Sequence, residues 1–491
     1  MLFVEARFFY FFAIVFAGYW MLSLNTLRKA WLLAASYAFY AAFFLGPEPF
    51  SGKPLPAGWW FPLLLMASTA LDYWIGLRLG GARGGRKAWV AASIVVNIGV
   101  LAWFKYMGFF VESAQAFSAW LGLPASIHTL KIILPVGVSF YTFQSMSYTL
   151  EVYRGHREPE RNLLNLATFI AFFPQLVAGP IVRASHLLPQ FATLRHWADV
   201  DVRGALALFM AGFFKKACVS DNIAPFVDRY YANPALFDAA SAWIAVPLYA
   251  VQIYCDFSGY TDMANAAARL LGYDLAINFN FPYFSRSVTE FWQRWHISLS
   301  TWLRDYLYIS LGGNRGPKWF VYRNLIVTML LGGLWHGSRW TFVVWGGLHG
   351  LALVVHREWS LRRPGWAQGR LWGAVAMALT FYFVSACLIF FRSADLSHPL
   401  GAEDFARALS VLKPYMGLGT MGTGGGESLD PRLFALLGGL ALLHWGNFRG
   451  WFATWWRKLP EPAFALGYGA ATVAVLLFIP VKYAPFIYFQ F

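Results

Sequence analysis

Two histidines and an arginine stand in an otherwise apolar stretch of the chain, LLGGLWHGSRWTFVVWGGLHG at 330–350. A titratable side chain at membrane depth is expensive and usually faces a protein interior or a wet cavity. Histidine titrates near neutral pH, which suits it to act as a general base on a hydroxyl group. His336 and His349 are therefore either packed side chains with satisfied hydrogen bonds or groups that take part in chemistry.

The spacing of the two histidines bears on this choice. On one continuous helix, the step from His336 to His349 corresponds to about 20 Å of rise and about 220° of rotation. The two cannot share a site unless the chain breaks between them. Gly332, Gly333 and Gly337 would loosen the helix around His336. The sequence does not decide whether His336 is a catalytic base or a packed residue. His349 fits a packing or pore-lining residue better.

The segment TEFWQRWHISLSTWLRDYLY at 289–308 is predicted to form one amphipathic helix. An apolar and a polar stripe run along it at helical spacing. Its tryptophans fit interfacial anchors. His296 lies between the stripes, near the start of the buried region, where a structural role fits it less well. The apolar stripe comprises Trp292, Trp295, Leu299 and Trp302, and the polar stripe Arg294, Ser298, Thr301 and Asp305.

Other polar patterns are weaker. Asp256 and Asp262 match no calcium loop, so we interpret them as structural partners for Arg or Tyr, or as residues lining a substrate path. His196 and Asp201 fit the His-x4-Asp pattern of soluble acyltransferases, but in a short loop where chance matches are common, so we discount them. The chain has no GxSxG, Walker or HExxH motif. We expect no metal site and direct transfer from donor to acceptor.

The composition indicates a polytopic membrane protein. Of 491 residues, 58% are hydrophobic and 13% are charged, whereas soluble domains have about a quarter charged. Apolar runs recur along the whole chain, and we expect an all-α fold of roughly ten to thirteen helices, some too short to span the membrane. We predict one domain over 1–491. The polar stretch 392–432 is expected to be an extramembrane loop, with a possible short helix at EDFARALSVLK.

The formal net charge of +15 lies mostly in short loops between apolar runs. Lys and Arg concentrate in the cytoplasmic loops of membrane proteins. This pattern puts residues 27–30 on the cytoplasmic side and the N-terminus outside, and it argues against nucleic acid as a partner. The loops are LRKA at 27–30, GGARGGRK at 80–87, YRGHREPER at 153–161 and HREWSLRRPG at 356–365.

Six ordered blocks of the sequence resemble the membrane-bound O-acyltransferases (MBOAT), and above all their bacterial polysaccharide-acetylating branch, typified by the membrane subunit of alginate O-acetylation. The resemblance covers nearly the whole chain. The blocks are ILPVGVSFYTFQSMSYTLEVYRG (133–155), FFPQLVAGPIVR (172–183), QIYCDFSGYTDMANAAARLLGYDL (252–275), NFNFPYFSRSVTEFWQRWHISLSTWLRDYLYISLGGNR (278–315), LLGGLWHGSRWTFVVWGGLHG (330–350) and PFIYFQF (485–491).

The resemblance implies site residues and a fold. The family's catalytic histidine corresponds to His336, and its second signature position to His296. The family fold is a ring of helices around a thinned centre with a through-tunnel, so both histidines are expected to face one cavity. Arg304 and Asp305 are expected to lie near the path of the acyl donor.

The resemblance also implies the reaction. The expected donor is cytoplasmic acetyl-CoA, with no permanently bound cofactor, and the acceptor is a hydroxyl group of an exopolysaccharide such as alginate or of a periplasmic SGNH-type partner. The protein is expected in the bacterial inner membrane, among membrane lipid. A transporter or flippase for a lipid-linked or polymeric substrate is the competing hypothesis, and a structural membrane scaffold is a third. The sequence leaves the identity of the acceptor open.

Overall fold

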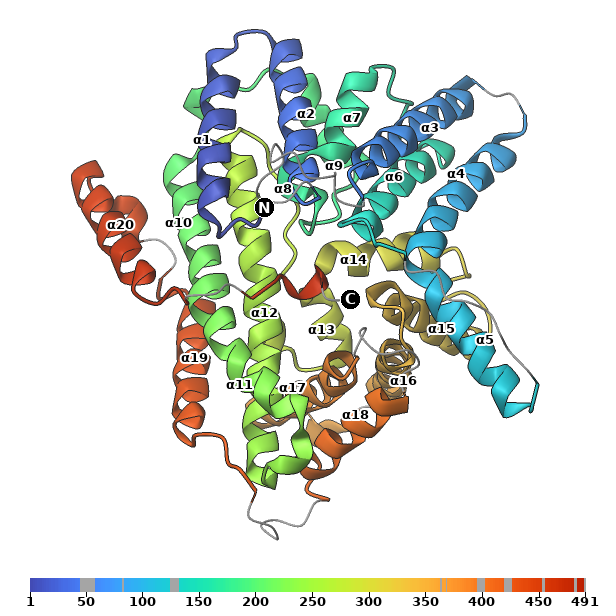
Figure 1. Cartoon of the computed structure of the whole chain (residues 1–491), viewed down its shortest axis with the longest axis vertical. Helices are drawn as coiled ribbons and strands as arrows, with labels where there is room; N and C mark the ends of the chain where they lie inside the picture. The colour runs from blue at the N-terminus through green and yellow to red at the C-terminus, as the bar shows by residue number, and fades with distance from the viewer. Residues whose placement is uncertain are drawn as a thin grey trace. The chain divides into compact units, whose positions relative to one another are not determined.

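The computed structural model of the chain describes residues 1–44, 58–81, 84–123, 132–362, 364–367, 369–394, 402–418, 426–452, 455–480 and 484–489. These residues form α-helices, labelled α1 to α20 in chain order (Figure 1). The same ranges contain no β-strand, and a bridge between Phe237 and Glu427 is isolated. The predicted all-α fold is confirmed.

The chain divides into two compact units. We call Met1–Ala211 with Tyr260–Ala276 the N-terminal unit, and Gly212–Gly259 with Ile277–Phe491 the C-terminal unit. The single domain expected over 1–491 stays a prediction. Of the polar stretch 392–432, residues 395–401 and 419–425 lie outside the described residues, and EDFARALSVLK lies within the helix α18 (Ala402–Tyr415).

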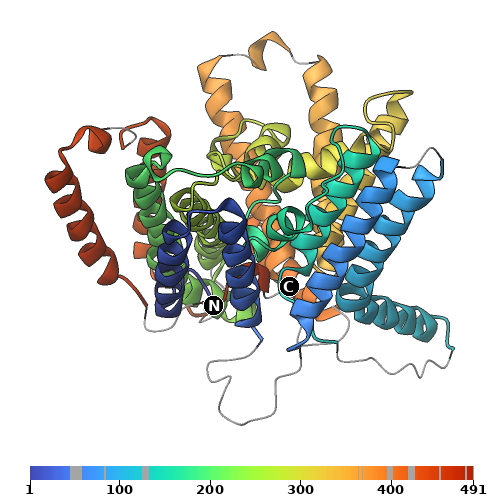
Figure 2. The same cartoon turned by 90° about the horizontal axis from the view of Figure 1, so that it is seen from above.

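The N-terminal unit is organised around α6, a helix whose residues are buried almost from end to end. It packs against α3, α4, α7 and α9, and Figure 2 shows α3 and α4 side by side in blue. The helices that begin in this unit are α1 (Ala6–Met21), α2 (Asn25–Ala41), α3 (Phe61–Gly81), α4 (Arg86–Leu101), α5 (Met107–Trp120), α6 (Val138–Tyr153), α7 (Leu163–Ala171), α8 (Phe173–Leu176), α9 (Ala184–Ala192) and α10 (Val202–Phe213).

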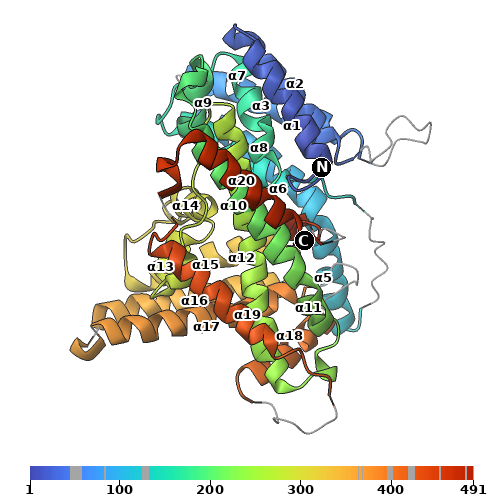
Figure 3. The ribbon, with the colours of Figure 1, turned by 90° about the vertical axis from the view of Figure 1, so that its left-hand side faces the viewer.

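The C-terminal unit contains three consecutive helices that lie side by side, α15 (Lys318–His336), α16 (Trp340–Arg362) and α17 (Arg370–Arg392) (Figure 3). The long helix α12 (Ala239–Leu270) begins in this unit and ends in the other. The remaining helices are α11 (Asp221–Ala232), α13 (Val288–Arg294), α14 (Ile297–Trp302), α18, α19 (Arg432–Phe448) and α20 (Glu461–Leu476).

Glycines allow α15 and α16 to approach each other closely. A Cβ atom on Gly333 would lie 2.2 Å from the backbone oxygen of Phe342, and one on Gly346 would lie 2.2 Å from that of Met329. Both distances are far below van der Waals contact, so a larger residue would separate the helices. The glycines thereby fix where the end of α15, and with it His336, is placed.

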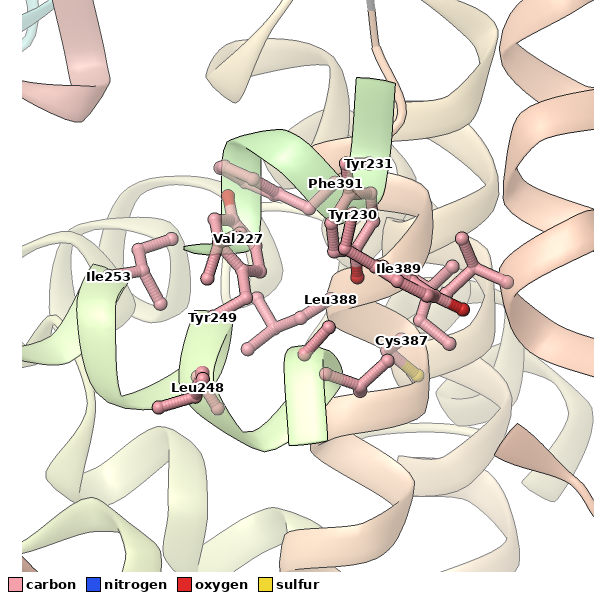
Figure 4. Packing of buried hydrophobic residues seen from close by; sticks show 14 of the residues in the cluster. Val227, Tyr230, Tyr231, Leu248, Tyr249, Ile253, Cys387, Leu388, Ile389 and Phe391 are labelled. Carbon is pink, nitrogen blue, oxygen red and sulfur yellow. The ribbon is translucent and has the colours of Figure 1, made fainter. Parts of the chain in front are cut away.

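A hydrophobic cluster supports these helices (Figure 4). Tyr230 and Tyr231 of α11 and Tyr249 of α12 pack with Leu388 and Phe391 of α17, all nearly or fully buried. The tyrosine rings supply large apolar area to this core. The cluster also includes Trp345 and Trp295, which line a cavity together with the histidines described below.

Among the residues that the structure describes, two helical segments are long and apolar enough to cross a membrane. They are Arg86–Trp120, which joins α4 and α5 through a π-helical turn, and Arg370–Arg392. Ala6–Met21 and Glu461–Leu476 are apolar but shorter. Other expected spans lie in helices, several of which are short, such as α2 with 17 residues and α6 with 16. The number of spans and the tunnel stay predictions.

Candidate functional site

His296 lies at a break between two short helices, so the prediction of one helix over 289–308 is wrong. α13 ends at Arg294, α14 begins at Ile297, and His296 has a left-handed backbone with φ of 42°. This conformation is uncommon for residues other than glycine and occurs preferentially at functional sites. Helical periodicity alone does not reveal such a break.

Asn278 stabilises this break. Its backbone oxygen accepts a hydrogen bond from the Ile297 amide at 2.9 Å. Its side-chain oxygen accepts two more from Ser298, from the amide at 3.2 Å and the hydroxyl at 2.9 Å. The first amides of α14 are thus satisfied by a loop, as a capping residue would satisfy them. The loop determines the backbone conformation at His296.

His336 is the last residue of α15, and α16 begins only four positions later, at Trp340. The chain therefore breaks between His336 and His349, which is the condition under which the two can share a site. Both line one small cavity in the C-terminal unit. The separation of about 20 Å expected on one continuous helix does not apply to these two histidines.

The rings of His296 and His336 lie 6.3 Å apart, measured between centroids. His296 is fully buried and His336 is 3% exposed. Tyr488, near the end of the chain, lies 5.6 Å from His336 and 6.2 Å from His296, again between ring centroids. Three distant parts of the sequence therefore meet at one point.

The cavity beside His336 has about 10 Å³ available to the centre of a water molecule, roughly the space one water needs. Five of its lining residues carry a polar ring nitrogen or a hydroxyl, namely His336, His349, Trp295, Trp345 and Tyr488. Such a site admits a small polar group and otherwise excludes water. The apolar lining residues are Ile253, Phe291, Val384, Leu388 and Phe391.

His349 is fully buried between aromatic rings, with Trp345 at 4.9 Å and Trp292 at 5.1 Å between centroids. Neither of its ring nitrogens has a hydrogen-bond partner within the described ranges. His349 thus lines the cavity, and a place for it in a pore stays a prediction. It differs from the expected packed histidine, because no described residue satisfies the hydrogen bonds of its ring.

Tyr488 is held in place by a buried charge network. The amide of Ile487 donates a hydrogen bond to Asp256 at 2.8 Å. Lys216 forms ion pairs with Asp256 at 2.6 Å and Asp221 at 2.7 Å, and its ammonium donates to the backbone oxygen of Ala484 at 3.0 Å. We call Lys216, Asp221 and Asp256 the buried anchor. It ties the C-terminal segment 484–489 to α12.

Backbone geometry brings the buried anchor together. Lys216 lies in a π-helical turn, Phe214–Ser220, which continues α10. A Cβ atom on Gly259 would lie 2.6 Å from the backbone oxygen of Gly212, so only glycine lets α12 approach this turn. The predicted partner of Asp256 was Arg or Tyr, and this prediction is wrong, because the partner is Lys216.

Arg304 and Asp305 form an ion pair with each other and do not line the cavity. Two contacts join their side chains, at 2.6 and 3.1 Å. The Arg304 side chain is 60% exposed. Both stand in the π-helical turn Leu303–Tyr308 that follows α14. A role near the acyl donor stays a prediction.

Other candidates from the sequence have simpler roles. Asp201 accepts a hydrogen bond from the Gly204 amide at 2.8 Å and so caps the start of α10, while His196 is exposed. Asp262 belongs to the part of α12 in the N-terminal unit. Within the described ranges, no group of three or more His, Cys, Asp or Glu side chains could hold a metal ion.

At the opposite end of the α15–α16 pair, Lys318 and Tyr322 both donate to the carboxylate of Glu358. These hydrogen bonds, that from Lys318 first, lower the pKa of Glu358 below its ordinary value. The hydrogen bond to Glu358 likewise raises the pKa of Lys318. The two helices are therefore joined by a charged contact far along the chain from His336.

No local sequence pattern assigns an individual role to Tyr488, Trp345 or Lys216. The terminal block PFIYFQF, which contains Tyr488, indicated that this segment matters, although its last two residues lie outside the described ranges. The position of Lys216 within the apolar run 203–218 indicated that its charge needs a partner. What they contact depends on tertiary packing, which no local pattern encodes.

Comparison with known proteins identifies relatives over most of the chain. Residues 159–394 match the family described as MBOAT, membrane-bound O-acyltransferase. The chain is 45% identical to the probable alginate O-acetylase AlgI of Azotobacter vinelandii, covering 73% of this chain and 69% of the relative. It is 42% identical to that of Pseudomonas aeruginosa (81% and 73%). It is also 34% identical to the peptidoglycan O-acetyltransferase of Helicobacter pylori (84% and 78%).

Proposed function

Because the chain belongs to the membrane-bound O-acyltransferase family, we propose that it moves an acetyl group from cytoplasmic acetyl-CoA to a hydroxyl acceptor outside the inner membrane. Relatives are named for acetylating alginate and peptidoglycan, which supports a cell-envelope polysaccharide as the final acceptor. We further propose a multi-pass protein that hands the acetyl group to a periplasmic SGNH-type partner. The observation that carries the proposal is the proximity of His296 and His336.

His336 is proposed to act as the general base. Its ring would take the proton from the acceptor hydroxyl, whose oxygen attacks the thioester carbonyl. The new C–O bond forms as the C–S bond breaks, and the proton passes to the leaving thiolate of CoA. No covalent acyl-histidine is required.

His296 is proposed to stabilise the transition state. A ring N–H close to His336 could donate to the oxyanion that develops on the thioester carbonyl, an interaction worth roughly 3–4 kcal/mol in other enzymes. Its position is fixed by the left-handed backbone and the Asn278 loop, so little reorganisation would be needed during the reaction.

The apolar lining of the cavity supports transfer over hydrolysis. Aromatic and aliphatic side chains surround the polar groups of His336 and Tyr488, and they leave room for little more than one water. Exclusion of bulk water protects a thioester during the transfer. Arg304, with its exposed guanidinium, is proposed with Asp305 to lie on the cytoplasmic approach of CoA, where positive charge would attract phosphates.

The test measures what becomes of both the acetyl group and the CoA part of the donor. Purified protein in nanodiscs would receive acetyl-CoA labelled in the acetyl group, together with acetylatable polymer and a periplasmic acceptor protein. We expect free CoA and acceptor-bound label in equal amounts. A transporter or flippase would give no stoichiometric release of CoA, and that result would refute the proposal.

Variants of His296 sharpen the test. His296→Ala should lower turnover by roughly 100-fold, whereas His296→Asn, which keeps a side-chain donor, should retain more activity. His156→Ala is the matched control, because His156 is exposed. Equal turnover in His296→Ala and His156→Ala would remove His296 from the mechanism.

A further inference from the structure

The N-terminal unit contains a cavity of its own, with a volume of about 430 Å³. Three basic side chains line it together with three aromatic rings and one leucine, and none of its lining residues is acidic. The basic residues are Arg28, Arg195 and His196, and the apolar ones are Phe16, Trp20, Leu194 and Trp197.

The arginines of this cavity are held by carbonyl oxygens instead of carboxylates. Arg28 donates from Nε to the oxygen of Leu22 and from Nη1 to that of Arg195, both at 2.6 Å. Arg195 donates to the oxygen of Gln190 at 2.9 and 3.2 Å. Neither guanidinium forms an ion pair with a carboxylate in the part of the chain that the structure describes. Their positive charge is left uncompensated.

Aromatic faces cover the same two guanidinium groups. Arg28 is 8% exposed and lies 5.0 Å from the ring centroids of both Tyr19 and Trp20. Arg195 lies 5.5 Å from the centroid of Tyr273. A buried cation without a counter-ion is costly, and arginine is suited to bind phosphate through paired hydrogen bonds. The cavity therefore favours an anion, and phosphate in particular.

The rim of the cavity is apolar and open. Trp197 is 49% exposed and Leu194 is 40% exposed. The Trp197 ring contacts Phe16 and Trp20, at centroid distances of 5.7 and 5.3 Å. A soluble anion gains nothing from an exposed apolar rim, whereas an amphiphile with an acyl chain does. Tryptophan is also enriched at the membrane interface.

We propose that this cavity binds the headgroup of an anionic phospholipid, with its phosphate against Arg28 and Arg195 and an acyl chain along Phe16 and Trp197. The charge pattern puts residues 27–30 at the cytoplasmic face, where anionic lipids are abundant and basic pockets bind their headgroups. Such a lipid would join α2 to the segment between α9 and α10.

Native mass spectrometry of the full-length protein in detergent would measure the binding of phosphatidylglycerol and of phosphatidylcholine. We expect phosphatidylglycerol to bind more tightly, and Arg195→Gln to weaken it about tenfold, the effect of losing one charged hydrogen bond. Arg449→Gln is the matched control, because Arg449 is exposed and packs against a tryptophan, Trp445, at 5.9 Å without lining this cavity. It should bind like the wild type.

A second variant separates binding from folding. Trp197→Ala keeps both arginines and removes part of the exposed rim, and we expect it to bind phosphatidylglycerol several-fold more weakly at an unchanged melting temperature without lipid. Equal binding of the two lipids, or equal effects of Arg195→Gln and Arg449→Gln, would overturn the proposal. Stabilisation by inorganic phosphate or by adenosine 3′,5′-bisphosphate, lost in Arg195→Gln, without a preference for phosphatidylglycerol would assign the cavity to a soluble anion and overturn it too.

Discussion

The His296 and His336 rings lie 6.3 Å apart between centroids, and each stands where a helix is interrupted. His296 occupies the left-handed turn between α13 and α14, and His336 is the last residue of α15. Neither side chain is therefore confined to a helix face. The site depends on two chain breaks and on the tight packing that places them together.

Gly333→Ala should disrupt this placement. The added methyl group would lie 2.2 Å from the Phe342 oxygen, so α15 and α16 must separate, at a cost of about 1–3 kcal/mol of stability. A shift of about 1 Å at His336 would lower the rate of acetyl transfer by as much as about 100-fold. Thermal unfolding and turnover would be measured on the same preparation.

Gly438→Ala is the control for this substitution. Gly438 lies within α19, and among the described residues no atom beyond its own stretch of helix lies within 4 Å of the Cβ position. Alanine should therefore stabilise the helix by about 0.5–1 kcal/mol and leave turnover unchanged. If Gly333→Ala behaved in the same way, close packing of α15 and α16 would not position His336.

His349→Leu should be tolerated. Neither ring nitrogen has a hydrogen-bond partner within the described ranges, and a buried polar group without a partner costs about 1–3 kcal/mol. Leucine removes that cost within a similar volume, so the melting temperature should stay the same or rise. Acetyl transfer should remain within a few-fold of the wild type. A loss comparable to that of a His336 variant would show that His349 takes part in the reaction.

Lys216→Met should weaken both stability and turnover. It leaves Asp221 and Asp256 buried without a cation, which costs about 3–5 kcal/mol, and it releases the segment that carries Tyr488. The triple variant Lys216→Met, Asp221→Asn, Asp256→Asn removes all three charges and keeps an acceptor for the Ile487 amide. Unfolding in denaturant should show much of the stability restored. No recovery in the triple variant would contradict the role of the buried anchor.

Glu358 should make stability dependent on pH in acid. Its pKa is lowered in the folded protein, so it contributes stability above its unfolded pKa of about 4.3, and this contribution is lost as the pH falls through the lower folded value. The melting temperature of the wild type should fall toward that of Glu358→Gln between about pH 5 and pH 3. A difference that stays constant over this range would mean that the carboxylate does not stabilise the pair of helices.

The sequence was informative about elements and about residue types. Apolar runs predicted an all-α protein, and the blocks around His296 and His336 pointed to the family that the comparisons confirm. Periodicity failed at His296, because a left-handed residue held by a distant asparagine looks helical in a one-dimensional pattern. Pairing across long sequence separations, as between Lys216 and Asp256, was likewise inaccessible. Such contacts arise from the close approach that Gly259 allows.

His336 is proposed to be the base for acetyl transfer. The most direct test measures the initial rate of CoA release by His336→Ala beside the wild type, with acetyl-CoA binding and melting temperature measured on both. We expect unchanged folding and binding with a rate reduced by about 100-fold to 10,000-fold. A rate within about threefold of the wild type, in a folded variant that binds acetyl-CoA, would contradict the role of His336.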